Sequence, residues 1–356
     1  MRERETSRSD LSREHQSPES GDSDRSPSFA QRHLHLGTAT VQLVDRQAGQ
    51  RSASRYDRAV RFAALLVAVV AAALSVQSSV TAGPRELRRL DVLVVAGQSN
   101  ALGYESYVVD PQTGVDIFTS GPRSQADRRV LFMWHESGVR MPSTSPVPLD
   151  TIQRRIGAER GIFGPEIGLA RSLYAAGHHQ LLIVKVAVGG SSLAKGWLPA
   201  HADYRLLINE VHAGVSWAWR HGWRPTVSAL YWFQGETDAT KAADSSAYAA
   251  NLTSFLAAIR IDLGLGKARP IVVTQTDVSD YIAYELAHRL CTSPNCESER
   301  AWNGAVMAAQ AAAAGTSTYV VPTSALPRVH NYVHLSNQAE LTLGQTFAQE
   351  TTALLP

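Results

Sequence analysis

This chain of 356 residues has little of several features that would narrow its function at once. It holds two cysteines, which excludes a disulfide-rich fold and a zinc site built from four thiolates. The 34 lysines and arginines barely exceed the 32 aspartates and glutamates, so a nucleic-acid partner is not expected. No glycine-rich lysine loop and no clustered histidine and carboxylate pattern occurs. These absences disfavour phosphoryl transfer and metal-dependent hydrolysis, and we expect neither a cofactor nor a metal.

The amino-terminal segment lacks apolar clusters. Residues 1–58 contain ten arginines and nine acidic residues, whose charges nearly cancel. Such a segment cannot bury enough apolar surface to offset its ordering entropy, so we predict that it is disordered. The alternative left open is that translation begins nearer the apolar run that follows.

That apolar run predicts the compartment. Arg55, Arg58 and Arg61 precede an almost wholly apolar stretch at 62–76 and a small-residue end, so residues 59–82 are typical of an export signal. The stretch is shorter than the roughly twenty residues of a usual spanning helix, but an uncleaved membrane anchor stays open. In either case we expect the chain after this segment to lie outside the cytoplasm, either secreted or anchored to the membrane through residues 62–76. Cys291 and Cys296 lie in a turn-rich segment, where a local disulfide is favoured over a metal site.

Residues 86–356 are predicted to form one α/β domain. Short apolar runs predict buried strands at 92–96, 181–187, 227–233, 270–275 and 318–322. Helical periodicity predicts helices at 166–177, 203–221, 248–263, 301–314 and 337–354, the last capped by Ser336. Because strands alternate with helices, we expect a five-stranded parallel sheet between two helical layers. Residues 104–163 show few periodic runs and are predicted to be an irregular region at the mouth of a pocket.

Residues suited to acyl transfer follow these strands, at the edge where open α/β sheets bind ligands. Such chemistry needs a nucleophile, a base and donors aimed at the oxyanion. Ser99 is the candidate nucleophile and His334 the candidate base. The candidate oxyanion donors are the backbone amides of Ser99 and of Gly189 or Gly190, with the side-chain amide of Gln234.

Four ordered blocks of residues carry a family resemblance. They are Gly97-Gln98-Ser99-Asn100, Lys185-x-Ala187-x-Gly189-Gly190-Ser191-x-Leu193, Trp232-x-Gln234-Gly235-Glu236-x-Asp238 and His334-Leu335, joined by Gly164-Pro165-Glu166 before a helix. In order and spacing they resemble the SGNH hydrolase superfamily, in particular its carbohydrate-esterase branch of acetyl xylan esterases and sialate O-acetylesterases. The resemblance covers roughly residues 90–350. It implies a flavodoxin-like three-layer α/β/α fold and metal-free removal of O-acetyl groups from sugars through an acyl-enzyme, with Ser99 as nucleophile and His334 as base.

One residue departs from that family. An aspartate usually lies three residues before the histidine, and this chain has Asn331 there. A neutral amide can orient an imidazole but does not stabilise its charged form as a carboxylate does. We favour the interpretation that Glu236 orients His334 instead and completes the catalytic set.

Two other functions remain open on the sequence. The first is a non-catalytic module that binds acetylated glycans, with Asn331 as the reason for its inactivity. The second is an SGNH esterase acting on another small acyl ester, which a broad apolar pocket would favour. The sequence identifies neither the sugar nor the oligomeric state.

Overall fold

The computed structural model describes residues 86–119, 124–136, 143, 145–151, 161–288, 290 and 296–355. The predictions for 1–58 and 59–82 lie outside the described residues. So does the predicted disulfide, because Cys291 falls in a gap. None of the helices in the described ranges is long and apolar enough to cross a membrane.

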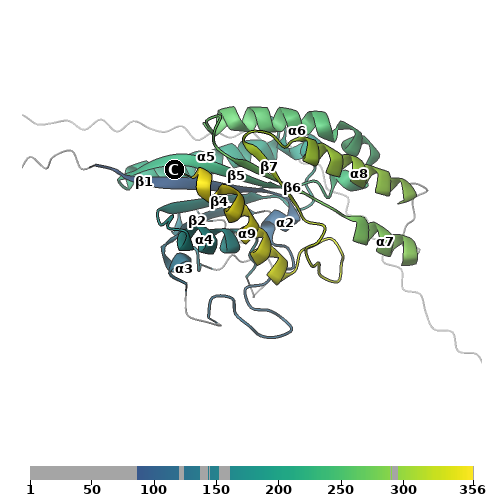
Figure 1. Ribbon diagram of the computed structural model, residues 1–356, viewed down its shortest axis with the longest axis horizontal. Helices are drawn as coiled ribbons and strands as arrows, with labels where there is room; N and C mark the ends of the chain where they lie inside the picture. The colour runs from purple at the N-terminus through teal and green to yellow at the C-terminus, as the bar shows by residue number, and fades with distance from the viewer. Residues whose placement is uncertain are drawn as a thin grey trace, which may run out of the picture. The chain divides into compact units, whose positions relative to one another are not determined.

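The described chain is built around a mixed, mostly parallel sheet of seven strands in the order β3-β2-β4-β1-β5-β6-β7 (Figure 1). The strands are β1 (Arg88–Gly97), β2 (Leu131–Glu136), β3 (Val147–Pro148), β4 (Leu181–Ala187), β5 (Trp223–Phe233), β6 (Ile271–Gln275) and β7 (Thr318–Pro322). Only the β2–β3 pair is antiparallel. The five predicted strands are β1, β4, β5, β6 and β7. Their spatial order, second, first, third, fourth, fifth, is that of flavodoxin-like sheets.

The prediction of a five-stranded sheet was wrong, because the region expected to be irregular contributes β2 and β3. β2 pairs in parallel with β4, from Leu131 opposite Leu182 to Glu136 opposite Ala187. β3 is only two residues long and pairs with the start of β2. A short apolar run beside polar loops gives little sequence signal, and strands this short are defined by the neighbours with which they pair.

The described α-helices are α2 (Ser99–Leu102), α3 (Gln125–Arg129), α4 (Glu166–Ala175), α5 (Ala202–Arg220), α6 (Ala242–Asp262), α7 (Ser279–His288), α8 (Cys296–Ala312) and α9 (Asn337–Thr351). Three short helical turns of other types are η1 (Leu193–Trp197), η2 (Asp238–Thr240) and η3 (Thr352–Leu354). The five predicted helices are α4, α5, α6, α8 and α9, although α6 and α8 begin several residues earlier than expected. The predicted cap of α9 is confirmed, because the Ser336 side chain accepts a hydrogen bond from Ala339 N. α2, α3 and α7 were not predicted.

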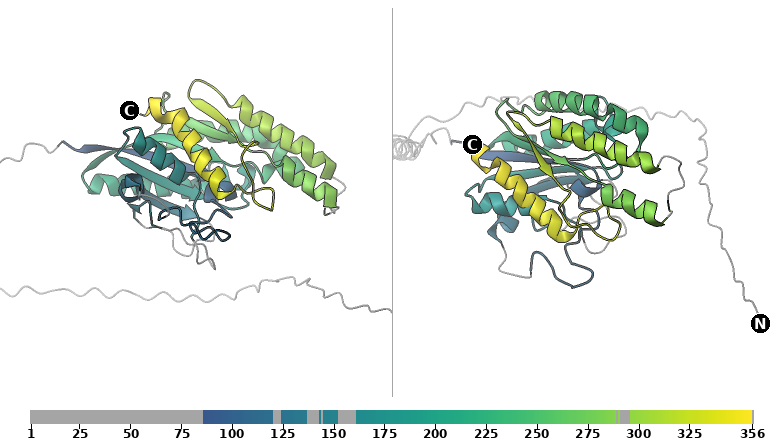
Figure 2. Two further views of the ribbon diagram at one scale, coloured as in Figure 1. Left: turned by 60° about the horizontal axis from the view of Figure 1, so that its bottom comes forward. Right: turned by 45° about the vertical axis from the view of Figure 1, so that its right-hand side comes forward.

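Alternate side chains of β1 point into two separate apolar cores. Leu93 packs in a cluster that includes Phe347 of α9, whereas Val94 packs in a cluster that includes Phe255 of α6. Figures 1 and 2 show α4 and α9 side by side on one face of the sheet, with α5, α6 and α8 on the other. The sheet is therefore buried on both faces, which explains the continuous apolar runs in its strands.

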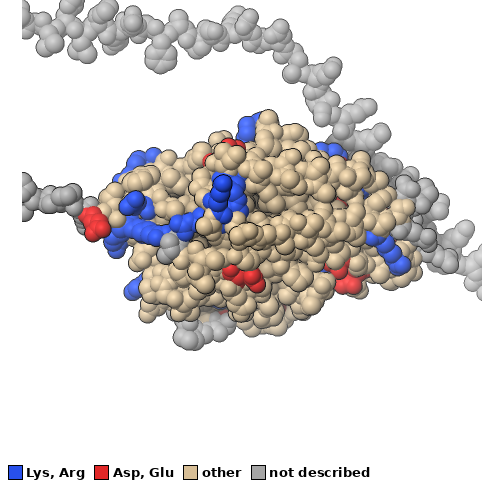
Figure 3. All heavy atoms as spheres, turned by 45° about the horizontal axis from the view of Figure 1, so that its top comes forward, with Lys and Arg blue, Asp and Glu red and all other residues tan. Residues whose placement is uncertain are grey.

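The two edges of the sheet differ. At the carboxyl edge Gly97 lies opposite both Ala187 of β4 and Phe233 of β5, at the point where the strand order reverses and ligands usually bind. The opposite edge holds a hollow of about 500 Å³ lined by Arg88, Arg89, Arg224 and Arg269, among others. Figure 3 shows basic side chains gathered toward the end where β1 begins. The residues predicted for catalysis follow the carboxyl ends of the strands, on the side away from this hollow.

Candidate active site

A cavity of about 650 Å³ opens at the carboxyl ends of β1, β4 and β5. Its wall includes the three residues predicted for catalysis, Ser99, His334 and Glu236, together with Gly189 and Gly190. Residues distant in the sequence are thus brought to one site. No group of three or more His, Cys, Asp or Glu side chains suited to a metal occurs within the described ranges.

Ser99 is the first residue of the short helix α2, and Gln98 alone separates it from the end of β1. Gly97 has a φ of +149°, and a Cβ there would collide with the carbonyl oxygen of Phe233, so this turn requires glycine. Leu102 N donates to Gln98 O at 2.9 Å and closes the turn. Because the first N–H groups of a helix have no partner within it, the Ser99 amide remains a candidate donor beside the hydroxyl.

A buried ion pair supports α2. The Lys185 ammonium, on β4, donates to the Leu102 carbonyl oxygen at 2.9 Å and to both carboxylate oxygens of Glu166 at 3.1 Å. Both charged side chains are completely buried. Lys185 therefore ties the carboxyl end of the serine helix to the central sheet.

Asn100 joins the serine turn to the loop that carries the histidine. Its Oδ1 accepts a hydrogen bond from Leu335 N at 3.0 Å, and its Nδ2 donates to Val333 O at 3.3 Å. The same Nδ2 donates to Glu236 Oε1 at 2.5 Å. Asn100 thus holds both neighbours of His334, a role that the sequence analysis did not assign. Its place beside Ser99 in the first block was the signal.

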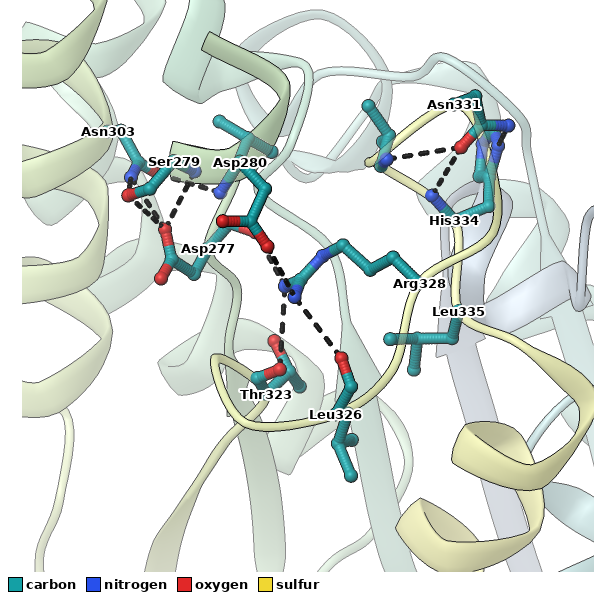
Figure 4. Close-up of polar contacts among 12 residues, drawn as sticks. Asp277, Ser279, Asp280, Asn303, Thr323, Leu326, Arg328, Asn331, His334 and Leu335 are labelled. Atoms are coloured by element: carbon teal, nitrogen blue, oxygen red, sulfur yellow. Dashed lines mark hydrogen bonds and ion pairs between the residues drawn. The ribbon is translucent and has the colours of Figure 1, made fainter. Parts of the chain in front are cut away.

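His334 lies in the loop between β7 and α9. Its ring packs against Tyr104 with the centroids 4.6 Å apart, and its Nδ1 lies 2.7 Å from Asn331 Nδ2. Asn331 Oδ1 accepts hydrogen bonds from Val333 N at 3.1 Å and His334 N at 2.9 Å (Figure 4). In the described structure Ser99 and His334 share the cavity wall without a direct hydrogen bond, which often forms only with substrate present.

Arg328 anchors the histidine loop and was also missed. Its nearly buried side chain donates to the carbonyl oxygens of Asp277 at 2.7 Å and Leu326 at 3.3 Å. Figure 4 shows the guanidinium reaching from the loop toward Asp277 and Asp280. The loop is thereby fixed to the segment that follows β6, and a lone arginine in the sequence carried no signal of this.

The structure does not place Glu236 against Nδ1 of His334, where Asn331 lies instead. Glu236 Oε1 accepts the bond from Asn100, and Oε2 is buried without a partner among the described residues. Burial raises the pKa of Glu236, and the Asn100 hydrogen bond opposes that shift. The favoured expectation that Glu236 orients His334 directly has no supporting hydrogen bond, and its link to the loop runs through Asn100.

Gly189 and Gly190 occupy their expected places on the cavity wall. Val188 N donates to Gly97 O at 2.9 Å, which ties the end of β4 to the serine turn. Gly190 has a φ of +69°, a conformation that favours glycine. The backbone of this segment therefore runs along the cavity, as an oxyanion donor requires.

Gln234 lies behind the cavity wall rather than on it. It is completely buried, and its Nε2 lies within hydrogen-bond distance of Gln98 Oε1, Ser191 O and Asp238 Oδ2, at 3.2, 3.2 and 2.5 Å. An amide nitrogen has two hydrogens, so three acceptors leave none for a substrate. Burial raises the pKa of Asp238 to about 6, and the Gln234 bond opposes the shift.

Gln98 lines the cavity and was not predicted as a site residue. Its Oε1 accepts from Gln234 Nε2 at 3.2 Å, Thr237 N at 3.3 Å and Gly235 N at 3.4 Å. Three converging donors fix the amide orientation. Gln98 Nε2 makes no hydrogen bond with the described residues and is not sealed from solvent. It is the side-chain amide left available to a ligand.

The comparisons agree with this architecture. A protein from Arabidopsis thaliana has a similar structure, with a TM-score of 0.52, 18% identity, and coverage of 75% of this chain and 100% of that chain. The structure of NanS has a TM-score of 0.51 and 15% identity, with coverage of 74% of this chain and 96% of that chain. At these identities the likeness shows a shared fold. No curated protein matches the chain.

A family model matches most of the described chain. The family model described as carbohydrate esterase, sialic acid-specific acetylesterase matches residues 89–353, which is nearly the whole described domain. This match confirms the expected family and the expected enzyme class, a carboxylic-ester hydrolase acting on O-acetylated carbohydrates. The chain belongs to the carbohydrate esterase, sialic acid-specific acetylesterase family.

Proposed function

We propose that this protein is an exported serine esterase that removes O-acetyl groups from carbohydrates through Ser99 and His334. The observation that carries the proposal is the meeting of these two residues on one cavity wall at the switch point of the sheet. The cavity, at about 650 Å³, has room for a sugar unit and its acetyl group. An acetylated carbohydrate is therefore the proposed substrate.

Acylation begins when Ser99 Oγ attacks the acetyl carbonyl carbon and passes its proton to His334 Nε2. The carbonyl π electrons move to oxygen, which becomes the tetrahedral oxyanion. When this intermediate collapses, the bond to the sugar oxygen breaks and that oxygen takes the proton from His334. Acetyl-Ser99 remains, and a water molecule activated by the same imidazole releases acetate and restores the serine.

The proposed oxyanion donors are the backbone amides of Ser99 and of Gly189 or Gly190. For the side-chain donor we propose Gln98 in place of the expected Gln234, because Gln98 lines the cavity and its amide nitrogen has no hydrogen-bond partner among the described residues. Loss of one such donor typically costs about 2.7 to 4 kcal/mol of barrier. Several must act together for efficient turnover.

The test is acetate release by the full-length protein from acetylated xylan and from O-acetylated sialic acid, beside p-nitrophenol release from its acetyl ester. Ser99→Ala and His334→Ala should abolish turnover of each substrate. Ser216→Ala and His212→Ala, which change exposed positions of α5, are the matched controls and should retain it. Folded native protein without Ser99-dependent turnover would contradict the proposal.

One observation favours a second function, carbohydrate binding without turnover: an amide rather than a carboxylate lies at Nδ1 of His334. Calorimetry with acetylated xylan fragments separates the two functions, since binding without acetate release would support a non-catalytic module. The other alternative, a longer acyl ester, is tested by comparing p-nitrophenyl acetate with the octanoate. Faster octanoate turnover would favour it.

We also propose that the protein is exported. The support is the sequence pattern of 59–82, with its apolar stretch at 62–76 and small-residue end. Fractionation of expressing cells and amino-terminal sequencing of the mature protein test this proposal and separate cleavage from anchoring. Full-length protein in the cytosol would contradict it.

A further inference from the structure

The side chain of Asn331 is held in one orientation by the backbone of its own loop. Its Oδ1 accepts hydrogen bonds from the N–H groups of Val333 at 3.1 Å and His334 at 2.9 Å. Rotation of the amide by 180° would place an NH₂ donor against these two donors and lose both bonds. The orientation of this amide therefore follows from the loop itself.

With Oδ1 engaged, the amide nitrogen faces the histidine ring. Asn331 Nδ2 lies 2.7 Å from His334 Nδ1 (Figure 4). An amide nitrogen only donates, so Nδ1 must be the acceptor, and a neutral imidazole with a bare Nδ1 carries its proton on Nε2. An Nε2 that already bears a proton cannot take one from a serine hydroxyl.

We propose that Asn331 holds neutral His334 in the Nε2–H tautomer, so that ester hydrolysis at Ser99 waits for a change of tautomer, and that an aspartate at position 331 removes this limit. The proposal rests on the proposed function of the Ser99–His334 site. The carboxylate introduced by Asn331→Asp would keep one oxygen on the two backbone N–H groups and present the other to Nδ1–H. The same geometry would then leave Nε2 bare and able to accept the serine proton.

Asn331 also affects the charged form of His334 that arises during the reaction. Transfer of the serine proton gives an imidazolium with N–H groups at both nitrogens. Nδ1–H would then point at the Asn331 NH₂ group, a contact between two donors. Asn331 therefore opposes both the productive neutral tautomer and the imidazolium, and an aspartate would favour both.

The direct test is the ¹⁵N spectrum of the histidine ring, with its signals assigned by their loss in His334→Gln. It is recorded at about three pH units above the ordinary histidine value of roughly 6.5, where the neutral ring dominates. The native protein should show Nε2–H and a bare Nδ1, and Asn331→Asp should show Nδ1–H. A native ring with its proton on Nδ1 would overturn the inference whatever the activity.

The second readout is the rate. Asn331→Asp should raise kcat for p-nitrophenyl acetate by roughly 10²- to 10⁴-fold. Asn209→Asp adds the same charge at an exposed position of α5 and should leave kcat unchanged. An unchanged kcat in Asn331→Asp despite the altered tautomer would overturn the link to rate. If folded Asn331→Asp shows Nδ1–H but no Ser99-dependent turnover, the proposed esterase function itself fails, and the spectrum identifies that failure separately.

Discussion

The side-chain oxygen of Asn100 accepts a hydrogen bond from the backbone N–H of Leu335, 3.0 Å away. The residue after the serine is thus tied to the residue after the histidine, although 235 positions separate them. This bond joins the serine turn directly to the histidine loop, and the Asn100–Val333 bond at 3.3 Å joins them a second time. The adjoining bond from Asn100 to Glu236 fixes the amide in place.

Replacing Asn100 with alanine should misplace the histidine loop. Because a misplacement of about 1 Å can cost roughly 10²-fold in rate, we expect a fall of that order in kcat with a small change in KM. Steady-state kinetics with p-nitrophenyl acetate measures both. Asn209→Ala, on exposed α5, is the control. A rise in KM alone would mean that Asn100 serves substrate binding instead.

Gln98 and Gln234 should differ in how they affect catalysis. Gln98→Leu removes the available cavity amide and is expected to lower kcat by about 10²- to 10³-fold. The control is Gln180→Leu at an exposed position before β4. Gln234→Leu leaves the buried Asp238 and Gln98 oxygens short of a donor, so its main effect should be on the midpoint of urea unfolding. Equal kcat for native protein and Gln98→Leu would exclude Gln98 as an oxyanion donor.

The buried Lys185–Glu166 pair predicts a large loss of stability on removal of one partner. Lys185→Met leaves a buried carboxylate without its cation and should lower the free energy of unfolding by about 3 to 5 kcal/mol. Lys195→Met removes an ammonium that is 71% exposed and lies 3.5 Å from the buried Asp244, and because water screens the exposed partner it should cost less than about 1 kcal/mol. Urea unfolding at neutral pH compares the two. Similar losses would show that burial does not set the cost here.

Glu340 predicts a pH dependence of stability. Burial, with Glu166 nearby, raises its pKa well above the ordinary 4.5, and neither carboxyl oxygen has a partner among the described residues. Between the pKa of the unfolded chain and the higher native pKa, Glu340 therefore holds a proton in the native state that it releases on unfolding. Its contribution to stability is complete below about pH 4.5 and is lost as pH rises toward the native pKa.

Glu340→Gln keeps the shape of the side chain without the titration. Between about pH 5 and pH 8 its free energy of unfolding should fall less steeply than that of the native protein. Glu236 and Asp238, whose pKa values are also raised, leave part of the slope in both proteins. Urea unfolding at both pH values gives the two slopes. Parallel slopes would mean that Glu340 is not protonated in the native state.

Much of the fold followed from local patterns. Buried strands such as Leu181–Ala187 are continuous apolar runs, and α4 has helical periodicity with Pro165 before its start. β2 and β3 escaped prediction because short strands at the side of a sheet are defined by the neighbours with which they pair. α2 was not predicted because four residues are too few to show helical periodicity. It is supported by the turn at Gly97 and by the hydrogen bond from Lys185 to the Leu102 carbonyl oxygen.

The candidate site residues Ser99, Gly189, Gly190 and His334 could be proposed without the structure, since each follows or belongs to a recognisable strand or block. Their hydrogen-bond partners could be identified only in the folded chain. A hydrogen bond depends on where a side chain points, and Gln98, Asn100 and Arg328 acquired their roles from contacts with residues far away in the chain. The sequence already shows that Asn331 takes the place of the aspartate usual in the family. Its consequence for His334 depends on which end of the amide the loop turns toward the ring, and the backbone geometry sets that.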